Sequence, residues 1–121
     1  MSVINYRDSR PIFEQISDHY KHLILAGVLE PGEKLPSVRS LAVELATNPN
    51  TIQKAFAELE RGGFCYSVQG KGSFVTDEMG SLLKEKKEEL SERMVEIRNE
   101  AKAVGIDADE LWKKTAERTE K

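Results

Sequence analysis

The feature that most constrains this chain is a pair of short amphipathic segments separated by a tight turn at 47–50. The first follows Pro36, has Ser37 as its candidate N-cap, and carries apolar residues at helical spacing, namely Val38, Leu41, Ala42, Leu45 and Ala46. The second opens with Asn48 and Pro49, typical of an N-cap and a first helical position, and its apolar stripe is Ile52, Ala55, Phe56 and Leu59. Two helices joined this closely are typical of a helix-turn-helix, although short helix pairs also occur in other small α-helical proteins.

A longer helix is predicted before this pair, and a β-hairpin after it. The helix starts at Pro11, ends at Gly27, and buries one face made of Ile12, Phe13, Ile16, Tyr20, Leu23 and Ile24. After the glycine pair at 62–63 the period changes to that of a strand, because Phe64, Tyr66 and Val68 alternate with Cys65, Ser67 and Gln69. A turn at 69–72 then leads into a returning strand at 73–76. Because a lone hairpin is unstable in water, it must pack on the helices, which is the winged form of the motif.

The composition changes near Thr76, after which Lys, Glu and Leu dominate. Residues 1–76 carry eight Lys/Arg and eight Asp/Glu, so the whole net charge of -3 lies in residues 77–121. We place a domain boundary at 76–80, where Gly80 and Ser81 would supply a flexible joint and an N-cap. The predicted domains are therefore 1–76 and 77–121.

A long helix over about 78–104 is predicted to dominate the second domain. Its apolar residues fit a heptad seam interrupted by Lys87, and they are Leu83, Leu90, Met94, Ile97, Ala101 and Val104. Gly105 fits the helix end, and Asp107 with Glu110 resembles a capping box for a last short helix that carries Leu111, Trp112 and Ala116. One small domain cannot cover so long a seam, so we predict that the seam, Leu111 and Trp112 join two copies of the chain. The alternative is that the helix packs back onto the N-terminal domain.

Several classes of protein are excluded by what the sequence lacks. A single cysteine, Cys65, allows no internal disulfide, which favours a reducing cytoplasm. His19, His22 and Cys65 are too few for a closed zinc site, and no nucleophile with its base and orienting group can be assembled. We therefore predict no metal, no cofactor and no enzymatic activity. The longest apolar run is only 23–26 and the polar N-terminus does not resemble a signal peptide, so no association with a membrane is expected.

Four segments carry a resemblance to a known family. They read GEKLPSVRSLA at 32–42, NPNTIQKAF at 48–56, and LERGG then QGKGSFV at 59–63 and 69–75. In this order they resemble motifs of the GntR-family winged helix-turn-helix regulators, from about Pro11 to Thr76. The short helical tail is similar to the YtrA subfamily, since the chain has no room for the larger effector or aminotransferase-like domains of other subfamilies. Ser40 stands where the family often has an acidic residue, and we expect little effect on DNA binding.

The resemblance implies a set of DNA contacts, most of them on the helix that follows Asn48. Its first turns present Asn50, Thr51, Gln53 and Lys54 away from the buried stripe, where a recognition helix meets base edges. Gln53 can pair with adenine and Lys54 suits a phosphate. The remaining predicted contacts are Arg39 and Ser37 at the start of the preceding helix, Gly70 and Lys71 at the wing tip, and Lys34 and Arg10 as further phosphate candidates.

Each of these residues also has a plainer interpretation. Asn50 and Thr51 could serve only the turn that caps the helix, as Asn48 is expected to do. Arg39 could be a solvated helix arginine, and Lys71 a solubilising residue on an ordinary hairpin turn. His19 and His22 are expected to be ordinary helix residues, and Cys65 a small strand residue without redox function.

Together these features predict a cytoplasmic transcriptional regulator, acting as a repressor and as a homodimer on a palindromic DNA operator. The resemblance suggests that the regulated operon encodes an ABC transporter, and that an unidentified small-molecule effector could bind between the tail helices. The alternative is a winged-helix module that docks other proteins without specific DNA binding. The polar face of the third helix favours DNA, because a docking face should carry apolar anchors.

Overall fold

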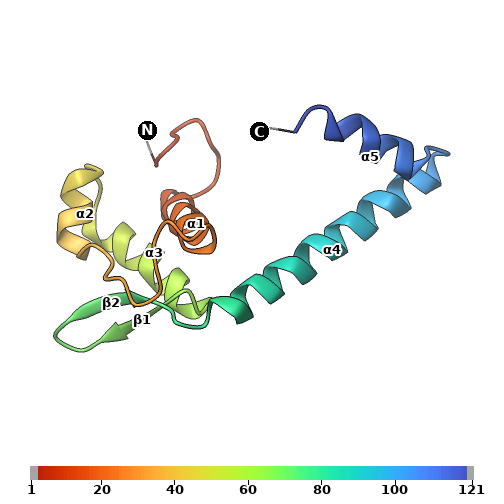
Figure 1. Ribbon diagram of the computed structural model, residues 1–121. Coiled ribbons are helices and arrows are strands. Elements are labelled where there is room, and N and C mark those ends of the chain that lie inside the picture. Colours follow the sequence, from red (N-terminus) through yellow and green to blue (C-terminus); the bar gives the residue numbers. More distant parts are fainter. Residues whose placement is uncertain (1–2, 120–121) are drawn as a thin grey trace. The chain divides into compact units, whose positions relative to one another are not determined.

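The computed structural model describes residues 3–119; residues 1–2 and 120–121, the outer ends of the two predicted domains, lie outside it. The chain is mainly α-helical with one antiparallel hairpin, which confirms the predicted fold class (Figure 1). The elements are α1 (Ile12–Leu25), α2 (Val38–Glu44), α3 (Pro49–Arg61), β1 (Cys65–Val68), β2 (Gly72–Val75), α4 (Met79–Ala103) and α5 (Ala108–Ala116). They form two compact units, one ending at Leu83 and the other beginning at Lys84.

The helix ends follow local capping chemistry. Asn48 caps α3, its side chain accepting a hydrogen bond from the backbone N–H of Asn50 at 2.7 Å, and Ser37 caps α2 by accepting from the N–H of Ser40 at 3.1 Å. At the other end of α3, Gly63 has a φ of 81°, a left-handed conformation that lets Phe64 N–H reach back to the carbonyl of Leu59. The predicted limits of α3 are therefore confirmed.

Helix α2 is shorter than predicted, because the predicted apolar stripe extends to Ala46. It ends at Glu44, and Ala46, placed on the helical stripe in the prediction, instead has a φ of 51°. This conformation lets the N–H of Thr47 bond the carbonyl of Ala42 at 2.9 Å and turns the chain toward α3. Ala46 takes the place that glycine usually fills, so no local signal marked the end of the helix.

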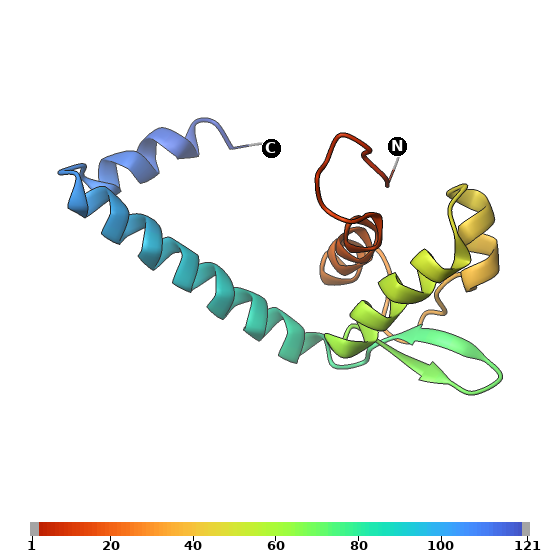
Figure 2. The same cartoon turned by 180° about the vertical axis from the view of Figure 1, so that it is seen from behind.

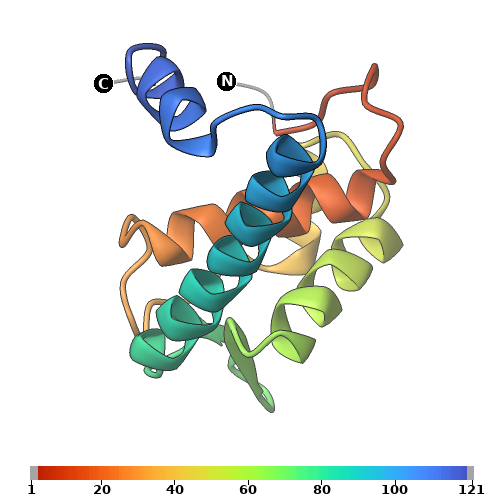
Figure 3. The same ribbon diagram turned by 90° about the vertical axis from the view of Figure 1, so that its right-hand side faces the viewer.

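The hydrophobic core of the first unit lies where α1 packs on α3 and α2 packs on α3 (Figures 1 and 3). The side chains of Ile16, Ile24, Ile52, Leu59 and Val75 are completely buried. The stripes predicted for α1 and α3 supply most of this core. Ile4, from the segment before α1, is also buried in it, although the sequence pattern did not indicate this.

The segment between α1 and α2 pairs with the hairpin, although the sequence pattern did not predict this pairing. The N–H groups of Gly32 and Leu35 donate to carbonyls of Val75 and Ser73 at 2.9 and 2.8 Å, and Val75 N–H donates to Glu33 at 2.8 Å. Residues 32–35 thus lie along β2 as a short third partner. Figure 2 shows the free turn of the hairpin projecting from this base.

The alternating pattern predicted β1 correctly, but the larger apolar side chains do not mark its buried face. Cys65 is buried, whereas Tyr66 and Val68 are 41% and 36% exposed. Tyr66 stacks on Phe74 of β2, with ring centroids 5.9 Å apart, on the outer side of the hairpin. The inner side carries Ser67, whose hydroxyl donates to Glu60 of α3 at 2.8 Å.

The predicted flexible joint at Gly80 and Ser81 is wrong, because both residues lie inside α4. Thr76 Oγ1 instead accepts a hydrogen bond from the N–H of Glu78 just before the helix begins. Leu82 is buried in the first unit, whereas Leu83, the residue placed in the seam, is 47% exposed. The first turn of α4 is therefore part of the first unit.

The second unit contains the rest of α4 and α5, joined by a tight reversal. Gly105 has a φ of 76° and Ile106 N–H bonds the carbonyl of Ala101 at 2.8 Å, as predicted for this helix end. Asp107 caps α5 by accepting from the N–H of Asp109. Within residues 3–119, no helix has the length and apolar character that crossing a bilayer requires.

Candidate nucleic-acid interface

The first turns of α3 bring together the four polar residues predicted for it. A shallow, open depression on the exposed side of this helix is lined by Asn48, Asn50, Thr51, Gln53, Lys54 and Ala57. The opposite side of the helix buries its apolar stripe in the core, which fixes the orientation of this polar face. Ala57 was not predicted, although it lies four residues after Gln53, and its methyl group could contact a thymine methyl.

The caps of α3 leave its polar side chains available. The side chain of Asn48 satisfies Asn50 N–H, and its carbonyl accepts from Thr51 N–H at 2.9 Å. Asn50 and Thr51 contribute only backbone groups to this turn. Within residues 3–119, the side chains of Asn50, Thr51 and Gln53 form no hydrogen bonds, so their donors and acceptors are free for a ligand.

Lys54 is positioned by the neighbouring helix. Its ammonium lies over the ring of Phe13 in α1, 5.3 Å from the ring centroid. A cation–π contact at an exposed site is worth only about 0.5–1 kcal/mol, so a phosphate could readily draw the ammonium away. The contact holds the charge beside the polar face of α3 in the absence of a ligand.

The start of α2 supplies a hydroxyl network and an exposed cation. Ser37 donates to Ser40 Oγ at 2.9 Å, and Ser40 donates to the carbonyl of Ser37 at 3.1 Å. Ser40 thus supports the cap without adding the negative charge that the family often has there. Arg39 is exposed between the two serines and forms no ion pair with any described residue.

The wing tip combines a permissive turn with two lysines. Gly70 has a φ of 77° and open space around the position of a Cβ, and the exposed Lys71 follows it. Gly72, with a φ of 111°, lies close to Lys34, since a Cβ on it would be 3.1 Å from Lys34 Cε. Neither lysine forms an ion pair within the described part of the chain.

Arg10 has a different environment from the other predicted cations. Its guanidinium pairs with Asp8 at 3.1 Å and with Asp18, and hydrogen bonds to these carboxylates raise its pKa. Nearby, the buried Gln15 accepts from Asn5 N–H at 2.8 Å and donates to the carbonyl of Arg10 at 3.1 Å. These contacts fasten the segment before α1 to the helix, and they offset the charge of Arg10.

The alternative sites considered in the sequence have little chemical support. The ring of His19 packs edge-on against Tyr20, and the described residues contain no group of three or more side chains able to hold a metal. Burial, together with the nearby Glu60 carboxylate, raises the pKa of Cys65 to about 11. A thiol with that pKa carries almost no thiolate at neutral pH, which removes the basis for redox sensing.

The predicted dimerisation residues lie along α4 and α5 with different exposure. Leu90, Met94 and Ile97 are 43%, 42% and 55% exposed, and Val104 and Trp112 are 68% and 60% exposed. Leu111 is half-buried. Ala101 is already buried within its own chain. The unit therefore presents a row of apolar side chains to its surroundings.

Comparison with known proteins agrees with this geometry. The model of the gntR family of bacterial regulatory proteins matches residues 12–75. The HTH-type transcriptional repressor YtrA of Bacillus subtilis (strain 168) is 38% identical over 112 residues, which is 92% of this chain and 86% of that protein. A GntR family transcriptional regulator from Listeria monocytogenes is similar in structure, with a TM-score of 0.75 and 34% identity over 93% of this chain and 98% of that one.

A DNA complex is also among the similar structures. The AraR DNA-binding domain in complex with operator ORR3 has a TM-score of 0.54 and 30% identity, over 60% of this chain and 88% of that one. The matched motifs, the free polar face of the helix after the turn, and the near full-length similarity to YtrA all agree. The chain therefore belongs to the GntR family of bacterial regulatory proteins, which are DNA-binding transcriptional regulators and not enzymes.

Proposed function

We propose that this regulator is a repressor that binds a pseudopalindromic operator as a homodimer, with α3 in the major groove and the wing beside the minor groove. The observation that carries the proposal is the exposed face of α3, where the side chains of Asn50, Thr51 and Gln53 form no hydrogen bonds with described residues. Recognition helices place such residues against base edges. The structural similarity to the AraR DNA-binding domain, which is in complex with an operator, supports DNA as the ligand of this domain.

The residues divide by the chemistry that they offer to DNA. Gln53 can donate to N7 and accept from N6 of adenine, while Asn50 and Thr51 can reach neighbouring bases or phosphates. Arg39 and Lys54, which form no ion pairs with described residues, suit phosphates. Phosphate contacts position the protein without specifying sequence. Lys71 and Lys34 would act similarly from the wing, and Ser37 from the start of α2. We assign Arg10 a secondary part, because two carboxylates already share its charge.

We assign DNA binding to the first predicted domain, 1–76, and assembly to the second, 77–121, although the compact units of the structure meet at Leu83 and Lys84. Exposed apolar side chains on α4 and α5 are the support for assembly, because water-exposed leucine, isoleucine and tryptophan in a row favour a partner surface. A second copy is the natural partner, since a two-fold protein matches a two-fold operator. Leu83, Leu90, Met94, Ile97, Val104, Leu111 and Trp112 would form this interface, with Ala101 behind it.

The regulated genes are inferred from kinship. The resemblance to the YtrA subfamily suggests control of the protein's own operon, and of an ABC transporter encoded there. Because the target is chromosomal DNA, we place the protein in the cytoplasm. We also propose that a small-molecule effector acts through the tail, by favouring one spacing of the two reading heads over another.

Fluorescence anisotropy with the protein's own upstream promoter DNA tests the proposal. A scrambled duplex is the specificity control, and both are titrated at two salt concentrations. We expect tight, salt-sensitive binding that prefers the promoter, because displaced counterions make the affinity of phosphate contacts fall steeply with salt. Arg39→Ala should weaken this binding, whereas Arg93→Ala, which removes an exposed arginine from α4, should not.

Weak binding that is equal on both duplexes and insensitive to Arg39→Ala would refute operator recognition at this promoter. Genomic selection of bound fragments with purified protein would then decide the matter. Recovery of a discrete DNA site would restore the proposal, and recovery of random fragments would favour the docking-module alternative.

A further inference from the structure

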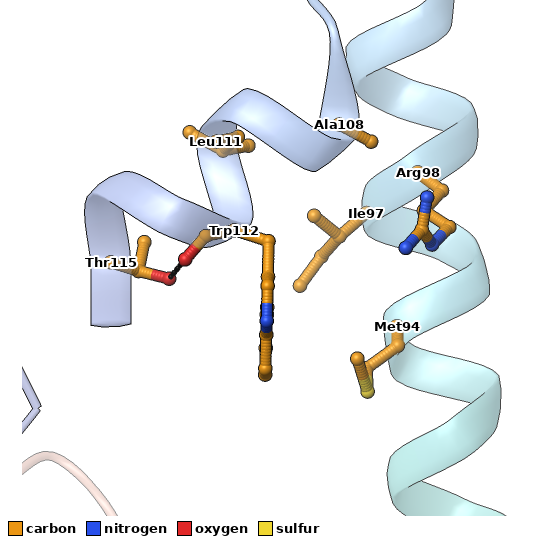
Figure 4. Close-up of a pocket in the computed structure, with 7 residues that line it drawn as sticks. All are labelled: Met94, Ile97, Arg98, Ala108, Leu111, Trp112 and Thr115. Atoms are coloured by element: carbon orange, nitrogen blue, oxygen red, sulfur yellow. Dashed lines mark hydrogen bonds between the residues drawn. The ribbon is translucent and has the colours of Figure 1, made fainter.

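An apolar pocket of about 170 Å³ lies between α4 and α5, in the second unit of the chain (Figure 4). Met94 and Ile97 of α4 face the indole of Trp112 across it, and Leu111 and Thr115 of α5 complete the lining with Arg98. An engineered cavity of about 150 Å³ lined by similar side chains is large enough for benzene. The space between the indole and the two α4 side chains therefore suits a flat apolar group of that size.

The pocket has one charged side chain, Arg98, among its lining residues. Arg98 Nη2 lies 3.3 Å from Asp109 Oδ1, and both side chains are more than half exposed. An exposed pair of this kind is worth little, so the guanidinium can turn its remaining N–H groups to another anion at small cost. Asp109 lines the neighbouring polar depression and not the apolar pocket, so its carboxylate does not line the space that a ligand would enter.

Two other polar groups belong to lining residues, the Thr115 hydroxyl and the Trp112 indole N–H, and the hydroxyl offers no donor. Thr115 Oγ1 donates to the carbonyl of Trp112 at 2.8 Å, which occupies its hydrogen. A ligand would therefore find apolar walls along its body and a single cation at one end. This combination selects for an apolar, planar molecule that ends in an anionic group.

We propose that this pocket binds a small monocarboxylate with an aromatic or similarly flat apolar body. Its ring would lie between Trp112 and the Met94 and Ile97 side chains, and its carboxylate would accept hydrogen bonds from Arg98. The proposal rests on the function proposed above, because four residues of the pocket are also assigned to the dimer interface, namely Met94, Ile97, Leu111 and Trp112. The ligand would therefore bind at the edge of that interface and act as the effector. Occupancy would link α4 to α5 and so fix the geometry of the assembly surface.

Trp112 is the single tryptophan of the chain, so intrinsic tryptophan emission reports on the surroundings of this one side chain. Titrations are made at one fixed protein concentration, so that any contribution from assembly stays constant. The probes are phenylacetate, which has the predicted chemistry, and 2-phenylethanol, its neutral counterpart of nearly equal size. The variants are Arg98→Gln, which removes the cation, and Ala108→Phe, which fills the pocket from the first residue of α5. Arg93→Gln is the matched control, because it removes an exposed, carboxylate-paired arginine from the same helix outside the pocket.

We expect phenylacetate to change Trp112 emission saturably in the full-length protein. Because a charge-assisted hydrogen bond is lost, Arg98→Gln should weaken this binding about tenfold, with Arg93→Gln unchanged. The neutral alcohol should bind about tenfold more weakly and should not respond to Arg98→Gln. Ala108→Phe should abolish the response, and circular dichroism checks that each variant remains folded.

Equal binding of the acid and the alcohol, or phenylacetate binding unaffected by Arg98→Gln, would overturn the anionic ligand class. No emission change with either probe would overturn the site. If Trp112 is then also shielded from acrylamide and becomes accessible on dilution, a second copy of the chain fills the pocket instead.

Operator titrations with and without phenylacetate keep this inference separate from the proposed function. Unchanged operator affinity in the presence of a bound ligand would overturn the effector role. A protein that binds no operator at all would refute the proposed function, while the Trp112 titration would still decide whether the pocket binds its ligand.

Discussion

Ala46→Gly should make the protein more stable. Ala46 has a φ of 51° and is exposed, and among the described residues it is the only non-glycine with a positive φ. The left-handed conformation costs a residue with a Cβ roughly 1–2 kcal/mol, which glycine avoids. Glycine in turn lowers the free energy of unfolding by about 0.4–1 kcal/mol relative to alanine, because it gives the unfolded chain more conformational freedom. The net gain is about 0.5–1 kcal/mol, or an increase in Tm of about 2–6 °C for a domain of this size.

Thermal and urea unfolding followed by circular dichroism measure this change. The matched control is Ala57→Gly, the same substitution at an exposed alanine inside α3, which should cost about 1 kcal/mol. The two variants therefore shift Tm in opposite directions. A fall in Tm for Ala46→Gly would show that the α2–α3 turn does not hold Ala46 in the left-handed conformation, and the account of how α2 ends would be wrong.

Three further predictions concern the interface, the assembly and the core. Gln53→Ala should weaken promoter binding by about 1–3 kcal/mol and change binding to scrambled DNA little. Equal losses of affinity on both duplexes would show that Gln53 does not recognise a base. Lys71→Ala should lower the slope of log affinity against log salt concentration by about one. Leu90→Lys should shift the protein toward monomer in sedimentation velocity, whereas Val95→Lys, on the same helix off the seam, should leave the assembly intact; a dimer that tolerates Leu90→Lys would exclude the seam as its interface. Cys65 should react slowly with a thiol reagent in the folded protein at neutral pH, and fast in urea. Because folding raises the pKa of Cys65 to about 11, the free energy of unfolding should fall as the pH rises from about 9 toward 11. Rapid modification of native protein would contradict its burial.

The candidate interface was largely predictable because its residues are placed by local signals. Asn48 and Pro49 define the start of α3, and a 3.6-residue period then decides which side chains face the core and which face outward. The same reasoning holds for Gly105 and Asp107, which end α4 and start α5. Each signal acts within one or two helical turns, so it can be read without knowing what lies nearby in space.

Other features depend on residues far apart in the sequence. Arg10 and Arg39 carry the same charge. Only the folded chain shows that Arg10 pairs with Asp8 and Asp18, whereas Arg39 forms no ion pair with a described residue. The structure likewise shows that the cap of α3 uses only the backbone N–H groups of Asn50 and Thr51, which leaves their side chains available. A count of charged residues along the sequence does not distinguish a paired arginine from one without an ion pair.

By itself, the sequence determined the order of the helices, the hairpin, and the polar face of α3, because caps, glycines and helical periodicity act over short distances. Tertiary structure alone decided that residues 32–35 pair with β2, and that Cys65 is buried while Tyr66 is exposed. It also decided that Leu82, and not Leu83, anchors the start of α4. Whether a side chain is buried depends on the surface that it packs against, and residues distant in the sequence form that surface.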